Sequence, residues 1–291
     1  MQIEVLVAAD SSDHPATQPG FYIAKVCIRR PCRTVADERT MHRSVKLLVS
    51  VRSSKEALAA FEGGADIIDV KDPSNGSLGL AQSCVIEQIT DLIHARSPNM
   101  MISAALGEVS ESTVSNAVNL SAVSHLTLVK SGLSGLLSLP TPWQKAWHRF
   151  REMTSLRHSK TQWVAVAYAD ERRSDSPSVM DVLEEGHRIG CPFLLIDTFQ
   201  KDGTSLLDWV SQRNLDRIRR RTRDLGMKLA LAGQITTGLL PQVLCCDPDI
   251  VAVRGSVCAD GHRGKTVTRS RVRSFAAILG QQQRQWQRME S

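Results

Sequence analysis

Beyond residue 45, short apolar runs alternate with longer segments of helical character, and this alternation restricts the fold more than any other feature of the sequence. The runs are rich in Val, Ile, Leu and Ala, which is typical of strands buried on both faces. They cover residues 46–51, 65–70, 101–105, 125–129, 163–168, 192–196, 228–232 and 250–253. The helical segments cover residues 53–62, 82–95, 111–122, 142–156, 178–189, 206–225, 237–244 and 269–288. Strands and helices that alternate in this way form parallel βαβ units.

Eight strand–helix repeats within roughly 245 residues match the size of a closed (β/α)₈ TIM barrel, which is the α/β fold that we predict. A doubly wound open sheet is the structural alternative for the same alternation. Residues 1–44 contain scattered proline and charge without a sustained period. We therefore expect a poorly ordered N-terminal extension over residues 1–44 and a catalytic barrel domain over residues 45–291. Translation could also begin at Met41, and no role for the extension follows from the sequence.

The composition argues against several classes of protein. No run of about 18 apolar residues occurs, so we expect no membrane span. The first residues include Glu4, Asp10 and Asp13 and no basic cluster, so they do not resemble a secretory signal. The seven cysteines form no CxxC pair, which favours reduced thiols in a cytoplasmic protein.

The net charge of +6 includes one dense basic run, Arg217–Arg223, within a helical segment. Such a run is usually a solvated helix face, and that is our interpretation. Aromatic residues make up only 4% of the chain, which argues against stacking platforms for single-stranded nucleic acid. We expect no nucleic-acid partner, and a basic scaffold or RNA-binding protein that uses this run is the alternative from another functional class.

Charged side chains gather at the predicted carboxyl ends of the strands, where barrels of this type carry their active sites. Asp69 and Lys71 lie two residues apart on one strand and therefore share a face. If Ile68 and Val70 pack against the helices, this acid and this lysine face the interior of the barrel. Lys130, Asp197 and Lys201 end or follow two further strands. A buried ion pair that only holds the strand register is the alternative interpretation of Asp69 and Lys71.

The last two strands carry a pattern typical of anion binding. Gly233 and Gln234 follow one of them, and Arg254 and Gly255 follow the other. Loops at these places hold phosphate in many barrels through backbone N–H groups. Ser77 lies in a turn-rich segment after Lys71 and could add a hydroxyl. The alternative is that the glycines only make tight turns.

Lysines grouped in this way are suited to carbonyl chemistry. An amine attacks a carbonyl only when it is unprotonated, and nearby ammonium groups and desolvation lower its pKa. Lys71 beside Lys130 and Lys201 meets both conditions, whereas Asp69 opposes them and could move protons once an imine exists. These residues favour a Schiff-base lyase or aldol-type synthase. A phosphosugar epimerase or decarboxylase that uses Asp-x-Lys for proton transfer without an imine is the alternative enzyme.

Sequence patterns for a metal or an organic cofactor are lacking. The histidines are scattered, and neither GxGxxG nor a P-loop pattern occurs. We therefore expect neither metal nor cofactor.

Several strings of the sequence resemble one enzyme family, (5-formylfuran-3-yl)methyl phosphate synthase, also called 4-(hydroxymethyl)-2-furancarboxaldehyde-phosphate synthase. The resemblance extends over about residues 45–280. It rests on KLLVSVR at 46–52, GGADIIDVKDP at 63–73, GSLG at 76–79, SAALG at 103–107, AYAD at 167–170, DT at 197–198, KDG at 201–203, ALAG at 230–233 and VRG at 253–255.

The resemblance implies a barrel related to class I aldolases that acts as a carbon–oxygen lyase on phosphates. Two glyceraldehyde 3-phosphate molecules would be joined, with loss of water and one phosphate, into a furan aldehyde phosphate for methanofuran biosynthesis. It places the Schiff-base lysine on Lys71, further catalytic lysines on Lys130 and Lys201, and catalytic aspartates on Asp69 and Asp197. It implies no metal or organic cofactor, and it leaves the oligomeric state and the division of proton transfers open.

The chain departs from the family pattern in two places. The N-terminal extension is additional. Glu108 stands where the family pattern leads us to expect Asp.

Overall fold

The computed structural model describes residues 4–6, 23–25, 44–111, 125–154 and 160–290. The chain divides into two compact units, Met1–Met41 and His42–Ser291. In the first unit, β1 (Glu4–Leu6) pairs with β2 (Ile23–Lys25) in an antiparallel two-stranded sheet. The second unit contains all the other elements described below.

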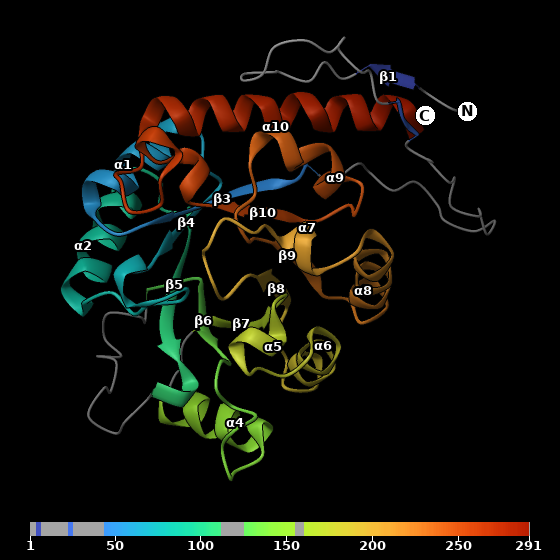
Figure 1. Ribbon diagram of the computed structural model, residues 1–291. Coiled ribbons are helices and arrows are strands. Elements are labelled where there is room, and N and C mark those ends of the chain that lie inside the picture. Colours follow the sequence, from blue (N-terminus) through green and yellow to red (C-terminus); the bar gives the residue numbers. More distant parts are fainter. Residues whose placement is uncertain (1–3, 7–22, 26–43, 112–124, 155–159, 291) are drawn as a thin grey trace, which may run out of the picture. The chain divides into compact units, whose positions relative to one another are not determined.

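The second unit contains a closed barrel, drawn in Figure 1, in which every neighbouring pair of strands is parallel. Its strands are β3 (Lys46–Val51), β4 (Ile67–Val70), β5 (Met101–Glu108), β6 (Leu128–Gly132), β7 (Gln162–Tyr168), β8 (Phe193–Asp197), β9 (Lys228–Leu231) and β10 (Ile250–Val253). The strands follow chain order around the barrel, and β10 closes it by pairing with β3. The predicted barrel is thus confirmed and the open sheet is wrong.

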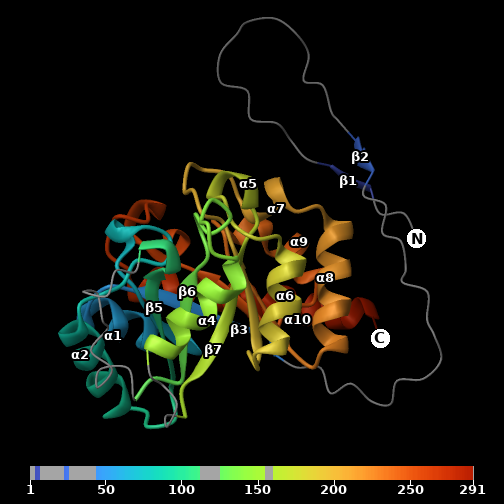
Figure 2. The ribbon, with the colours of Figure 1, turned by 90° about the horizontal axis from the view of Figure 1, so that it is seen from below.

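Helices cover the outside of the barrel. They are α1 (Ser54–Gly63), α2 (Ser83–His94), α4 (Trp143–Met153), α5 (Glu171–Ser174), α6 (Val179–Arg188), α7 (Leu206–Trp209), α8 (Gln212–Asp224), α9 (Leu240–Leu244) and α10 (Arg269–Glu290). The long α10 lies across α1 and α9 (Figure 1), and α6 and α8 lie side by side (Figure 2). Local signals delimit α1: Ser53 accepts a hydrogen bond from the Glu56 N–H at 3.3 Å, and Gly64 ends the helix at a φ of 96°.

One expected helix, over residues 206–225, is two helices in the structure. Ser205 and Asp208 form a capping box at the start of α7, and Val210 is extended. Ser211 then caps α8 by accepting a hydrogen bond from the Asn214 N–H. Serine at both positions favours a new helix start over continuation, because its hydroxyl satisfies N–H groups that a helix start leaves free. Most of the helix expected over residues 111–122 lies outside the described residues.

The faces of the strands separate as predicted. Ile68 and Val70 of β4 belong to the apolar layer between the barrel and the helices. Ile67 belongs to the smaller cluster inside the barrel, together with inward residues of the other strands such as Leu48 and Leu128. Because side chains alternate along a strand, Asp69 points inward, above the apolar interior at the carboxyl end of the barrel. The core thus ends where the charged residues begin.

Three arginines of the basic run on α8 pair with neighbouring acids. Arg219 pairs with Asp249 at 2.7 Å, and Arg221 pairs with Glu184 of α6 at 2.6 Å. Arg223 pairs with Asp247. These contacts and the exposure of Arg217 and Arg220 agree with a solvated helix face. No helix in the part of the chain that the structure describes is long and apolar enough to span a membrane.

Candidate active site at the carboxyl end of the barrel

Lys71 follows β4 directly and is buried. Its Nζ donates a hydrogen bond to the Ser77 carbonyl oxygen at 3.1 Å. Ser77 lies in the loop after β4, and its own hydroxyl donates to the Thr198 carbonyl oxygen at 3.1 Å. Among the described residues, no carboxylate lies within ion-pairing distance of the Lys71 amine. This lysine is therefore held by neutral groups.

Lys130 of β6, in contrast, forms a buried ion pair with Asp69. Both side chains are almost completely excluded from solvent. The Asp69 carboxylate also accepts hydrogen bonds from the hydroxyls of Ser50 at 2.8 Å and Ser103 at 2.7 Å. Lys130 in turn contacts the Ser103 hydroxyl at 3.1 Å. Asp69 is thus surrounded by donors on both oxygens.

The two serines were not among the predicted site residues. A signal for them exists, because Ser50, Asp69 and Ser103 share one register level on β3, β4 and β5. Serine at an inward position beside an acid is a donor in reach of that acid. The strand register that brings them together is a tertiary property and is not readable from any of the three strands alone.

Lys201 forms the second ion pair, with Asp197 at the end of β8. Its Nζ lies 2.6 Å from Asp197 Oδ1, and it also donates to the Thr198 carbonyl oxygen at 2.5 Å. Among the described residues, the other carboxylate oxygen, Oδ2, accepts a hydrogen bond only from the Ser77 hydroxyl, at 3.4 Å. Asp197 therefore keeps one weakly engaged oxygen, unlike Asp69.

The charges of this cluster shift one another's pKa values. Burial lowers the pKa of Lys71 from 10.5 to about 8, and the ammonium groups of Lys201 and Lys130 act in the same direction. The carboxylates of Asp197 and Asp69 partly oppose this effect. For the two acids themselves, burial favours a higher pKa, but the attraction of the neighbouring lysines outweighs it and lowers the pKa of each. Both acids are therefore expected to be ionised at neutral pH.

A further buried acid lies near the ends of β5 and β7. Glu108 accepts hydrogen bonds from the Tyr168 hydroxyl and, at 3.0 Å, from the Ser134 N–H. Burial raises the pKa of Glu108 and raises that of Tyr168 well above its ordinary value. Gly132 leaves room for this carboxylate, since a Cβ there would lie 2.0 Å from Glu108 Oε2.

The predicted anion-binding residues also lie at this end of the barrel. Gly233 has a φ of 99°, and a Cβ at this position would lie 3.0 Å from Thr198 Cγ2. Gln234 donates its amide to the Thr204 carbonyl oxygen. Within the described residues, the N–H groups of Gly233, Gly255 and Ser256 have no acceptor. The loops after β9 and β10 thus offer backbone N–H groups that could bind an anion.

Arg254 has a different environment from the one expected of a phosphate ligand. It is buried and pairs with Glu56 of α1, Nη1 to Oε2, at 2.9 Å. Its remaining donors reach carbonyl oxygens of Ser50 at 2.9 Å, Arg263 at 3.0 Å and Lys265 at 3.4 Å. The guanidinium is fully engaged with the protein, so these contacts favour a structural role.

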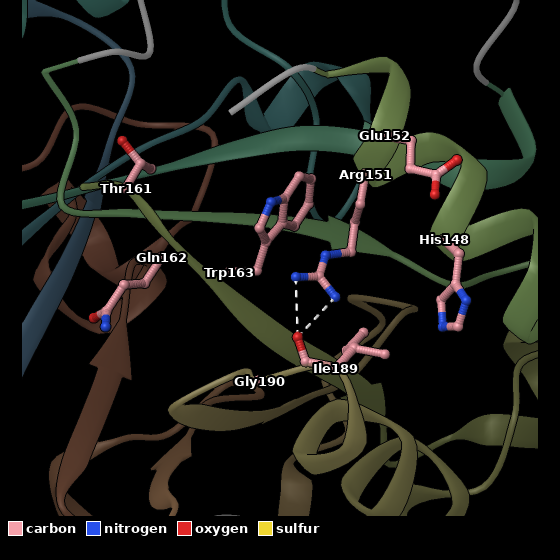
Figure 3. A pocket seen from close by; sticks show the side chains of 8 residues that line it. All are labelled: His148, Arg151, Glu152, Thr161, Gln162, Trp163, Ile189 and Gly190. Carbon is pink, nitrogen blue, oxygen red and sulfur yellow. Dashed lines mark hydrogen bonds between the residues drawn. The ribbon is translucent and has the colours of Figure 1, made fainter. Parts of the chain in front are cut away.

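A separate pocket of about 480 Å³ lies at the other end of the barrel (Figure 3). It is lined by Gln162 and Trp163 at the start of β7 and by residues near the ends of α4 and α6. Arg151 points into it and donates to the Ile189 carbonyl oxygen at 3.3 Å. The amino-terminal face of such barrels serves stability rather than catalysis, so we place the chemistry at the lysine cluster.

The groups in that cluster are amines, carboxylates and hydroxyls. No three His, Cys, Asp or Glu side chains of the described ranges are grouped as ligands for a metal ion. The arrangement is suited to nucleophilic attack by an amine and to proton transfer by nearby acids.

Comparison with known proteins adds an independent line of argument. Residues 47–276 match the profile of the 4-HFC-P synthase family. The chain is 36% identical to (5-formylfuran-3-yl)methyl phosphate synthase of Archaeoglobus fulgidus over 78% of this chain and 96% of that one. It is also 36% identical to the enzyme of that name from Methanococcus maripaludis strain C7, over 75% of this chain and 92% of that one. Among solved structures, 3-hexulose-6-phosphate synthase from Salmonella typhimurium has the same fold, with a TM-score of 0.53, 16% identity and coverage of 82% and 100%.

Proposed function

Since the chain belongs to the 4-HFC-P synthase family, an enzyme family, we propose that it condenses two molecules of glyceraldehyde 3-phosphate through an imine on Lys71. The product is (5-formylfuran-3-yl)methyl phosphate, and phosphate and water are released. This product would supply the furan ring in methanofuran biosynthesis. The observation that carries the proposal is the placement of one buried amine between two Lys–Asp pairs, with a pKa of about 8.

The assignment of the imine to Lys71 follows from how the two carboxylates are used. Asp69 pairs with Lys130, and Asp197 pairs with Lys201. In each pair the lysine nitrogen is held against a carboxylate and is not free to approach a carbonyl. Lys71 has no such partner among the described residues, and at pH 7 roughly one molecule in ten would carry it as the free amine. Lys71 is therefore the best nucleophile of the three.

The two acids differ in what they can do next. Asp69 accepts from Ser50, Ser103 and Lys130, so its oxygens are committed to holding the site. Within the described ranges, Asp197 Oδ2 has a single long contact, to the Ser77 hydroxyl. Isomerisation, aldol addition and elimination each need a proton to be moved. We assign these transfers to Asp197 with Lys201 and a positioning role to Asp69 with Lys130.

Phosphate binding is supported by the loops after β9 and β10. Free N–H groups at Gly233, Gly255 and Ser256 are the donors that barrels of this type use for phosphate. Gln234 and Ser77 already bind protein carbonyls and would shape the loops rather than supply the main contacts. Arg254 would contribute indirectly, because it holds the loop after β10 through hydrogen bonds to the carbonyl oxygens of Arg263 and Lys265.

The test is reductive trapping. Full-length protein is incubated with glyceraldehyde 3-phosphate and borohydride, and the modified peptide is identified by mass spectrometry. We expect one adduct on Lys71 and none in Lys71→Met, with the furan chromophore and released phosphate lost in that variant. Lys55→Met, which removes an exposed lysine of α1, is the control and should behave as the parent.

Two results would contradict the proposal. One is furan formation that persists in Lys71→Met. The other is conversion of a pentulose phosphate without furan product or adduct, which would favour proton transfer by Asp-x-Lys without an imine.

A further inference from the structure

Arg263 lies in the loop between β10 and α10 and is half-buried. Its Nη2 lies 3.5 Å from the carbonyl oxygen of Gly76, in the loop after β4. The next carbonyl of that loop, Ser77, accepts the hydrogen bond from Lys71 Nζ. The guanidinium and the proposed nucleophile thus contact consecutive carbonyl groups. This places Arg263 at the same end of the barrel as Lys71.

Arg263 forms no ion pair with an acid of the described residues. Within the described part of the chain, no carboxylate lies within ion-pairing distance of its guanidinium. Burial lowers its pKa, Arg254 acts in the same direction, and the attraction of Asp197 opposes them. By contrast, Arg254 pairs with Glu56 and Arg219 pairs with Asp249. A half-buried cation without an anionic partner is costly, and an anionic ligand would relieve that cost.

The backbone that carries Arg263 is firmly held. Arg254 donates to the carbonyl oxygens of Arg263 and Lys265, and the Ala259 N–H donates to the Thr266 carbonyl oxygen at 2.9 Å. Gly255 lies beneath the side chain, since a Cβ there would lie 3.8 Å from Arg263 Cβ. The free N–H groups of Gly255 and Ser256 are therefore close to this arginine. A fixed backbone and free donors nearby are what a preorganised anion site requires.

We propose that Arg263 binds the phosphate group of the substrate, together with the N–H groups of the loop after β10. A guanidinium presents parallel donors that match two phosphate oxygens. The identity of the ligand as a triose phosphate rests on the proposed function. The binding of a phosphate group by Arg263 does not, and it can be measured separately.

The experiment uses the full-length chain with Arg263→Gln and Arg263→Lys, and inorganic phosphate as the probe. Phosphate affinity is measured by calorimetry, and KM and kcat are measured with glyceraldehyde 3-phosphate. We expect Arg263→Gln to weaken phosphate binding and raise KM by roughly 10- to 100-fold, the range for a lost charge-assisted contact. Trapping of Lys71 at saturating substrate should persist. Arg263→Lys should lie in between, because it keeps the charge and loses the paired donors.

Arg273→Gln removes an exposed arginine of α10 and serves as the matched control, with unchanged values expected. If Arg263→Gln melts like the parent and binds phosphate within twofold of it, the inference is wrong. The same holds if the parent binds no phosphate. If the parent forms no furan product but binds phosphate in an Arg263-dependent manner, the proposed function fails and the inference stands. If Arg263→Gln does not fold, the comparison of parent with Arg263→Lys decides.

Discussion

Three lysines of similar sequence context have different environments in the folded chain. Lys130 and Lys201 each have a carboxylate partner, and Lys71 has a carbonyl. The inward position of Asp69 and Lys71 could be predicted, because the apolar residues between them identify the outward face. Which lysine pairs with which acid could not be predicted. That pairing depends on the register of strands that are distant in the sequence. Asp69 and Lys130, for example, lie 61 residues apart.

The pH dependence of trapping tests the environment of Lys71. The free amine is the reactive form, so the yield of adduct at short times should rise with pH, with a midpoint near pH 8, and level off at higher pH. Asp197 raises the pKa of Lys71, so Asp197→Asn should move the midpoint of the trapping curve to lower pH. Turnover should nevertheless fall, because the proposed proton-transfer group is lost.

Asp202→Asn is the control for this experiment. Asp202 lies in the loop that follows Asp197, is exposed, and pairs with Arg173 of α5. Its midpoint should equal that of the parent. A midpoint for Asp197→Asn above that of the parent would show that the assigned electrostatic coupling is wrong.

At the scale of elements, the boundaries of most strands followed from local sequence, and the contacts between elements did not. Gly63-Gly64 and Ser53 mark the ends of α1 without any tertiary information. The pairing of Glu56 on α1 with Arg254 after β10 joins residues 198 positions apart. From the sequence, Arg254 was therefore predicted to bind an anion at the end of a strand. In the structure it connects α1 to the loop after β10.

Glu56→Gln tests this connection through stability. Glu56 is buried and accepts hydrogen bonds from Arg254 and from the N–H groups of Arg52 at 3.0 Å and Val267 at 3.3 Å. Removing its charge leaves Arg254 buried without a counter-ion, so we expect a loss of about 3–5 kcal/mol in the free energy of unfolding.

Glu62 also lies on α1 and forms an exposed ion pair with Arg269 of α10 at 3.2 Å. Glu62→Gln breaks this pair and is expected to lower the free energy of unfolding by less than about 1 kcal/mol. Both values are obtained from denaturant unfolding curves of the parent and the variants. Equal, small losses for the two variants would mean that the Glu56–Arg254 pair does not stabilise the barrel.

For the whole molecule, the closed barrel brings together residues from its strands and from the loops that follow them at the carboxyl end. Every residue assigned to the site belongs to the unit His42–Ser291. A chain that begins at Met41 is therefore expected to keep kcat and KM within about twofold of the full chain, since it retains every group to which a role in binding or chemistry is assigned.

The measurement is steady-state furan formation by the two chains, with melting curves as a check of folding. A fall of tenfold or more in kcat for a folded, shortened chain would show that the first residues contribute to the site. Repetition of strand and helix made the barrel predictable, whereas nothing periodic in residues 1–44 allowed a comparable prediction.

The loop after β4 receives hydrogen bonds from both Lys71 and Arg263, on neighbouring carbonyls. A ligand that engages one of these groups changes the restraint that the other exerts on the loop. If Arg263 binds phosphate and Lys71 forms the imine, as proposed, these two events are thermodynamically linked, and the linkage acts equally in both directions. An aldehyde without phosphate would compete for Lys71 without this assistance. Selectivity for phosphorylated aldehydes could thus arise from coupling between two groups as well as from the affinity of either one.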